Sequence, residues 1–95
     1  MSPHTQTRAH FFILGRVQGV FFRSQTQKKA QQLKLGGWIR NLPDGRVEVV
    51  AEGGKEKIEE LIRWTKKSPT LARVSDLKIE WQEFKGEFNK FKIEY

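Results

Sequence analysis

The chain has 95 residues, enough for one hydrophobic core and too few for two. Hydrophobic residues make up 37% of it and aromatic residues 12%, a composition that fits a folded globular domain better than a disordered chain. The formal net charge of +7 favours anionic partners, namely phosphorylated metabolites, nucleic acid or acidic proteins. The absence of cysteine excludes disulfides and a thiol nucleophile.

The start of the chain does not look like a targeting segment. Residues 1–7 lack the apolar core of a signal peptide, and no run of about 18 apolar residues occurs that would span a membrane. We therefore expect a short mobile tail over residues 1–7 and one domain over residues 8–95, in a cytoplasmic protein with no membrane partner.

The first half of the chain predicts a strand, a helix and a hairpin. Residues 8–14 read as a buried strand. A helix is expected over residues 22–33, because Phe22, Thr26, Ala30 and Leu33 recur at helical spacing. Residues 36–54 predict a β-hairpin with its turn at Pro-Asp-Gly, residues 43–45. Its second strand should be half-buried, because Val47, Val49 and Ala51 alternate with polar residues.

The second half predicts another helix and two strands. Residues 55–67 form the clearest helix, with Ile58, Leu61, Ile62 and Thr65 on one face and charges on the other. Leu77, Ile79 and Trp81 alternate as a fourth strand, and Phe91, Ile93 and Tyr95 indicate a short fifth one. The order βαββαβ plus a short C-terminal strand predicts an α+β ferredoxin-like sandwich, an antiparallel sheet with two helices on one face. This fold hosts many functions and selects none.

The stretch "GRVQGVFFR", residues 15–23, has the composition of an anion-binding loop. Gly15 and Gly19 can adopt positive φ, so the N–H groups of Arg16, Val17, Gln18, Gly19 and Val20 can converge on one anion. Arg23 falls in the first turn of the expected helix, where the positive helix terminus and a bidentate guanidinium both favour phosphate. The alternative is an ordinary strand-to-helix turn with a solvated arginine.

Asn41 stands at the end of an expected strand, just before the hairpin turn. Its uncharged amide can hold a water molecule through both a donor and an acceptor. The alternative is that this asparagine only favours the turn that follows it.

The motifs together resemble the acylphosphatase family. That family shows G-R-V-Q-G-V-x-F-R, an alanine in the helix, G-W-V-x-N, D-G-x-V and a glycine, and these correspond here to residues 15–23, Ala30, residues 37–41, residues 44–47 and Gly53. The resemblance implies hydrolysis of small acyl phosphates, with Arg23 binding the phosphate and Asn41 positioning the attacking water. No cofactor and no metal ligands are expected, because neither a histidine cluster nor a carboxylate cluster is apparent.

A basic nucleic-acid-binding module of the same fold is the alternative function. Its signature strand of interleaved basic, glycine and aromatic residues is absent, and basic residues are interspersed with acids, so no specific nucleic acid is expected. Small size and a solvated surface favour a monomer.

Lys34 departs from the resembling family, which has a glycine where the first helix ends. The pattern therefore predicts that Lys34 occupies the left-handed C-terminal cap position, with Gly36 as the alternative cap.

Overall fold

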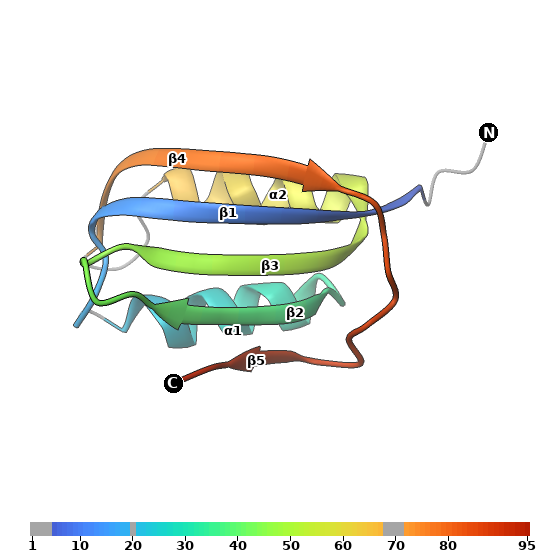
Figure 1. Cartoon of the computed structure of the whole chain (residues 1–95), viewed down its shortest axis with the longest axis horizontal. Helices are drawn as coiled ribbons and strands as arrows, with labels where there is room; N and C mark the ends of the chain where they lie inside the picture. The colour runs from blue at the N-terminus through green and yellow to red at the C-terminus, as the bar shows by residue number, and fades with distance from the viewer. Residues whose placement is uncertain (1–4, 20, 68–71) are drawn as a thin grey trace.

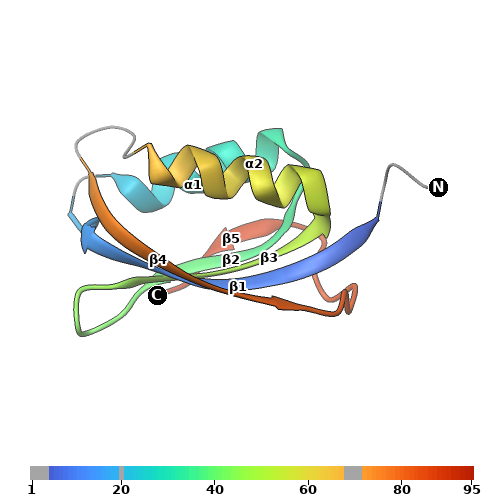
Figure 2. The same cartoon turned by 90° about the horizontal axis from the view of Figure 1, so that it is seen from above.

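A five-stranded sheet with two helices on one face forms the molecule, as Figures 1 and 2 show. This computed structural model describes residues 5–19, 21–67 and 72–95. The strand order is β4-β1-β3-β2-β5, with bounds β1 (Gln6–Arg16), β2 (Gly36–Asn41), β3 (Val47–Gly54), β4 (Arg73–Gln82) and β5 (Phe91–Ile93). The helices are α1 (Phe22–Gln32) and α2 (Lys55–Lys66). The predicted ferredoxin-like class is confirmed.

The two helices bury the stripes that their periodicity predicted. On α1, Phe22, Thr26 and Ala30 are buried, and on α2 all four predicted residues are buried. They pack on the sheet face that carries Ala9, Phe11 and Ile13 of β1. No helix in the described part of the chain is long and apolar enough to cross a membrane.

β1 begins earlier than the sequence indicated. Gln6 and Thr7, assigned above to a mobile tail, pair with Gly54 and Gly53 of β3, and the Thr7 hydroxyl donates to the Gln82 carbonyl at 3.0 Å. The remainder of the predicted tail, residues 1–4, lies outside the described residues. The polar sequence concealed this extension because its stabilisation comes from the ladder and not from apolar burial.

β3 is buried on both faces, whereas alternation predicted a half-buried strand. Val47, Val49 and Ala51 face the helices, but Glu48, Val50 and Glu52 on the other face are also buried, none more than 7% exposed. β3 is the central strand, and neighbouring side chains and the segment before β5 cover its open-face carboxylates.

The two edge strands, β4 and β5, also differ from what the sequence predicted. Ile79 and Trp81 lie opposite Phe11 and Ala9 on the helix-facing side of β4, yet they are 37% and 42% exposed because β4 is an edge strand. β5 pairs with β2 in parallel, so the sheet is mixed and not wholly antiparallel as predicted. The other three pairings are antiparallel.

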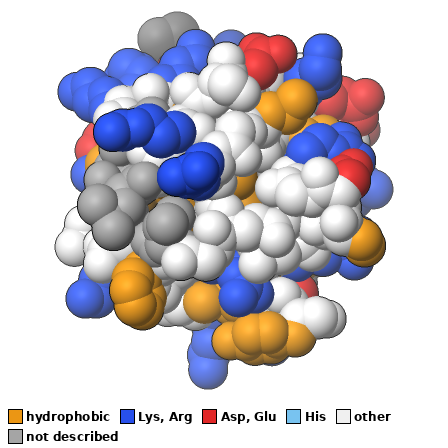
Figure 3. Space-filling model, turned by 90° about the vertical axis from the view of Figure 1, so that its left-hand side faces the viewer, with side chains coloured by type: hydrophobic (Ala, Val, Ile, Leu, Met, Phe, Trp, Pro, Cys, Tyr) orange, Lys and Arg blue, Asp and Glu red, His pale blue; other side chains and the backbone are white. Residues whose placement is uncertain are grey.

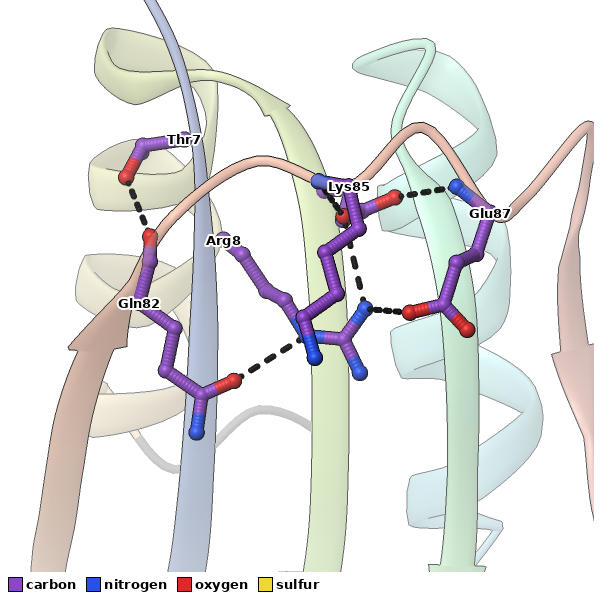
Figure 4. Close-up of polar contacts among 6 residues, drawn as sticks. Thr7, Arg8, Gln82, Lys85 and Glu87 are labelled. Carbon is purple, nitrogen blue, oxygen red and sulfur yellow. Dashed lines mark hydrogen bonds and ion pairs between the residues drawn. The ribbon is translucent and has the colours of Figure 1, made fainter.

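Glu52 fixes the path of the chain from β4 to β5. Figure 4 shows Lys85 and Glu87 of this segment lying close to Arg8 of β1. Its carboxylate accepts the backbone N–H groups of Lys85 and Glu87 at 2.6 and 3.0 Å and lies 3.3 Å from Arg8 Nη1. Burial raises the pKa of Glu52, but these donors outweigh it and hold that pKa below its ordinary value. The crossover segment is thus attached to the open face of the sheet by a buried anion.

Lys34 occupies the left-handed position at the end of α1, as predicted. Its φ is 60°, its N–H donates to the Gln31 carbonyl at 3.0 Å, and the Leu35 N–H donates to the Ala30 carbonyl at 3.0 Å. This pair of bonds is a Schellman motif, which normally uses glycine at the left-handed residue. Gly36 already belongs to β2, so the alternative cap is wrong.

We expect Lys34→Gly to stabilise the fold. Relief of the Cβ clash is worth about 1–2 kcal/mol, and the added unfolded-state entropy opposes it by about 0.4–1 kcal/mol, leaving a net gain of about 0.5–1 kcal/mol. Urea unfolding measures it. Lys28→Gly, at an exposed position inside α1, is the control and should lose about 1 kcal/mol. A lower midpoint for Lys34→Gly would contradict the strained cap.

Glu52→Gln should destabilise the protein at neutral pH by about 1–3 kcal/mol, because one charged acceptor of two backbone donors is lost. A lowered folded-state pKa gives stability that is present above the ordinary value of 4.5 and lost as the pH falls through the folded-state pKa. Urea midpoints from pH 7 to pH 3 should therefore fall less steeply for Glu52→Gln than for the parent. Parallel curves would refute this assignment.

Candidate functional site

A short connection between β1 and α1, residues 17–21, lies at the end of the molecule where β1 and β2 finish (Figure 1). The register of β1 against β4 shifts between Leu14 and Gly15, and a Cβ at Gly15 would collide with the Arg73 carbonyl oxygen. Gly19 adopts a φ of 74° with open space around its missing Cβ. Gly15, near the end of β1, therefore allows close backbone approach to β4, and Gly19 allows the turn of the loop.

Gln18 ties this loop to the β2–β3 hairpin. Its Nε2 donates to the carbonyl oxygens of Leu42 and Arg46, each at 2.9 Å. Leu42 directly follows Asn41, so these two bonds fix the loop relative to the end of β2. This link could not be predicted from the sequence, since a glutamine in a loop can bond to many different partners.

The N-terminus of α1 is open to an anion. Its cap residue, Phe21, makes no side-chain capping hydrogen bond, and the first turn contains no acidic residue. The leading N–H groups of a helix have no intrahelical acceptor, and the helix dipole places positive potential there. Arg23 lies in that first turn, half-buried, with its guanidinium 5.2 Å from the centre of the Tyr95 ring.

Arg23 also lines a cavity of about 320 Å³ at this end. Val17 and Gly19 of the loop, Phe21 and Tyr95 are among its other lining residues. Figure 3 faces this end of the molecule, and basic and apolar side chains lie next to one another along the lower part of the view. The cavity therefore combines a cation with apolar walls, a composition that suits an anion attached to an apolar group.

Asn41 is the last residue of β2, as predicted, and its side chain is unusual. The Oδ1 atom is buried and has no hydrogen-bond partner among the described residues. An unpaired buried acceptor costs about 1–3 kcal/mol, and such groups in native proteins call for an explanation. A position that pays this cost is a candidate for contact with a ligand or a reacting water.

The structure thus distributes the predicted site residues unevenly. Val17, Gly19 and Arg23 line one cavity, and Gln18 bonds to Leu42, the residue after Asn41, so these five predicted residues lie at the same end of the sheet. Arg16 is the last residue of β1, where it pairs with Arg73 and is exposed. Val20 lies outside the described residues. Tyr95 was not among the predicted site residues, and only the parallel pairing of β5 with β2 reveals its position.

The open face of the sheet carries a separate polar cluster. Glu48 accepts from Arg40 Nε at 2.6 Å and lies 2.7 Å from His10 Nε2. Burial raises the pKa of Glu48, but the bonds from His10 and Arg40 outweigh it and lower that pKa. Arg40 also lies over the Trp38 ring. Among the described residues, no group of three or more histidine, cysteine, aspartate or glutamate side chains is arranged to hold a metal ion.

Comparison with known proteins places this architecture in one family. The acylphosphatase family model matches residues 9–93. An acylphosphatase of Pelotomaculum thermopropionicum is 48% identical over 91 residues, covering 96% of this chain and 99% of that protein.

Solved structures agree. The acylphosphatase of Bacillus subtilis superposes with a TM-score of 0.90 at 32% identity, covering 94% of this chain and 99% of that one. The acylphosphatase of Coxiella burnetii gives a TM-score of 0.88 at 38% identity, covering 94% and 93%. An α+β sandwich with a glycine-containing loop and a helix terminus without a side-chain cap at one end is the class that the fold and the site define. The chain belongs to the acylphosphatase family.

Loss of the Gln18 link should loosen the site end. We expect Gln18→Leu to reduce the free energy of unfolding by about 1–3 kcal/mol, because two hydrogen bonds of about 0.5–1.5 kcal/mol each disappear. Amide hydrogen exchange should accelerate in residues 42–46. Gln32→Leu, on the exposed side of α1, is the matched control, and equal effects in both variants would show that Gln18 fixes nothing.

Proposed function

We propose that the protein hydrolyses acyl phosphates to a carboxylate and inorganic phosphate by direct attack of water on phosphorus. Arg23 and the loop N–H groups hold the phosphoryl oxygens, and Asn41 positions the water. The observation that carries most weight is the joining of three features at one end: an uncapped helix terminus with its arginine, a glycine-containing loop, and a buried asparagine oxygen without a partner.

Phosphate binding follows from the donors available. The guanidinium of Arg23 can grip two phosphoryl oxygens at once, and the N–H groups at the start of α1 supply further donors in a positive field. Among the described residues, Val17, Gln18 and Gly19 contribute loop N–H groups to this role, and we include Arg16 and Val20 in the proposed loop.

The leaving group explains why so few side chains suffice. Cleavage of the P–O bond leaves its electron pair on a carboxylate, whose conjugate acid has a pKa of about 4, so no general acid is required. Water forms the new P–O bond, and one of its protons passes to the phosphate product itself. What remains for the protein is neutralisation of phosphoryl charge and alignment of the water.

The net charge of the chain supports the binding of an anion in general. Residues 1–43 contain seven lysine and arginine residues and no acidic residue, whereas the rest of the chain has eleven of each sign. The whole net charge of +7 therefore comes from the segment that includes β1, the loop, α1 and β2. Such a field attracts anionic substrates and accelerates their association.

Nucleic-acid binding by the open sheet face is the weaker alternative. In the RNA-recognition version of this fold, aromatic side chains on the sheet stack with bases. Here Arg46 already lies 4.7 Å from the Phe12 ring centre and Arg40 lies 5.2 Å from that of Trp38, while Glu48 is buried in the same face. Arginine side chains thus already cover both rings, where a base would have to stack, and Arg40 is also paired with Glu48.

Hydrolysis of benzoyl phosphate, followed by its ultraviolet absorbance and by phosphate release, tests the proposal. Equal release of benzoate and phosphate is expected, with the same rate before and after treatment with a chelator. Absence of turnover would overturn the proposed function. Loss with the chelator and recovery with a divalent ion would overturn the direct role assigned to Arg23 and the loop.

Arg23→Ala should lower kcat/KM on the order of a hundredfold to a thousandfold and abolish competitive inhibition by phosphate, since the principal anion ligand is lost. Arg23→Lys should also lose at least about tenfold, because a lysine cannot bind bidentately. Arg63→Lys, exposed on α2, is the control for the same change of side chain. Near-parental kinetics in Arg23→Lys would refute the role of Arg23.

Asn41→Ala should reduce kcat by about a hundredfold to a thousandfold and leave phosphate inhibition nearly unchanged, because a group that orients water acts mainly in the transition state. Initial rates over a range of substrate and phosphate concentrations separate the two parameters. Asn89→Ala, at an exposed position before β5, serves as the control. A large rise in the phosphate inhibition constant with kcat intact would make Asn41 a binding residue instead.

A further inference from the structure

Two exposed aromatic side chains border the cavity that holds Arg23. Phe21 is 79% exposed, Tyr95 is 99% exposed, and both line the same cavity as the guanidinium. They come from opposite ends of the chain, Phe21 from the cap of α1 and Tyr95 from the residue pair beyond β5. Ile93 and Val17 form apolar parts of the lining.

The Phe21 side chain is not part of the hydrophobic core. The next residue, Phe22, is buried and stacks on Trp64 at 6.5 Å between ring centres, so Phe22 is the phenylalanine that belongs to the core. Phe21 instead has a φ of 61°, a conformation that costs a residue with a side chain about 1–2 kcal/mol. A bulky ring held at this cost, in solvent and beside a cation, suits contact with a ligand.

Tyr95 is placed by the sheet. Ile93 pairs with Ile39 in the parallel β5–β2 ladder, and the Glu94 N–H donates to the Ile39 carbonyl at 2.8 Å. Tyr95 follows Ile93 by two residues, just as Asn41 follows Ile39. The ring of Tyr95 reaches Arg23 at 5.2 Å, which places an aromatic surface next to the proposed phosphate ligand.

We propose that Phe21 and Tyr95 are the walls of an acyl-binding pocket, and that Phe21 sets a preference for acyl phosphates with flat apolar acyl groups. This inference rests on the proposed function. With the phosphoryl group on Arg23 and the loop, the attached acyl group enters the cavity between the two rings. An aromatic acyl group contacts both rings, whereas an acetyl group is too small to do so. The cavity is open to solvent, so the carboxylate product leaves without a lid.

The test compares kcat/KM for benzoyl phosphate and for acetyl phosphate. Phe21→Asn removes the ring and keeps a residue that tolerates positive φ. The benzoyl-to-acetyl ratio should fall by about threefold to tenfold, the range that one aromatic contact contributes, while the acetyl value stays within about twofold. Phe84→Asn is the control, because Phe84 is also exposed, at 41%, and lies outside this cavity. Its ratio should equal that of the parent.

Competitive inhibition supplies a second readout that does not depend on turnover. Phe21→Asn should weaken inhibition by phenylphosphonate by about threefold to tenfold and leave inhibition by inorganic phosphate unchanged. Tyr95→Leu should shift both measurements in the same direction, and it tests the pocket even if Phe21→Asn proves unstable.

The outcomes separate the two proposals. A parent protein that hydrolyses neither substrate fails the proposed function. A parent that hydrolyses both, with an unchanged ratio in Phe21→Asn and Tyr95→Leu, keeps that function and overturns the acyl pocket. An equal fall for both substrates also overturns it, because Phe21 would then act on the loop and not on the acyl group.

Discussion

The side-chain amide of Gln18 supplies the constraint on which the site depends. The loop belongs to the β1–α1 unit, whereas Asn41 belongs to the β2–β3 hairpin, and β3 separates β1 from β2 in the sheet. Two hydrogen bonds from one amide nitrogen, to the carbonyls of Leu42 and Arg46, cross that separation. Because both acceptors are backbone atoms of the hairpin, the bonds fix the loop to the fold and not to a flexible side chain. These bonds therefore hold Arg23 and Asn41 in a fixed relative position, although the two residues are 18 positions apart in the chain.

Every other part of the site is positioned by the end of an element. The dipole and free N–H groups come from the start of α1, Asn41 from the end of β2, and Tyr95 from beyond the end of β5. β5 is only three residues long, so its pairing alone is a weak anchor. The buried carboxylate of Glu52 strengthens it from a distance, because it fixes the crossover at Lys85 and Glu87 before the chain reaches β5. The carboxylate of Glu52 on the open face of the sheet thus helps to determine the position of Tyr95 at the end of the sheet.

The features that depend on residues close together in the chain could be predicted from the sequence. Periodicity predicted both helical stripes, whereas the left-handed position of Lys34 was predicted from the glycine that the resembling family has at this place. Arg23 and Asn41 became candidate site residues because their motifs combine specific chemistry with a place at the end of an element, and the structure confirms those places.

The features that the sequence did not reveal depend on partners distant in the chain. Glu52 looked like one polar residue of an alternating strand, and its donors lie 33 and 35 positions away. The parallel direction of β5 is set by the crossover that precedes it, which has no periodicity of its own. Phe21 and Phe22 are adjacent residues of the same type, so the sequence does not distinguish them. Because α1 begins at Phe22, that side chain points into the core, whereas Phe21 at the cap lies at the cavity.

The acidic residues nearest in sequence to the site are all paired with arginines. The first acidic residue of the chain is Asp44, in the hairpin turn, and it is paired with Arg46 at 2.9 Å. Glu48 and Glu52 are buried, which is costly for a carboxylate, and each recovers that cost through an arginine and further donors on the open face. Carboxylates at the start of α1 would have stabilised the helix, since its dipole favours negative charge there. The first turn of α1 nevertheless contains no acidic residue, and in the proposed function a carboxylate there would compete with phosphate for Arg23 and the loop.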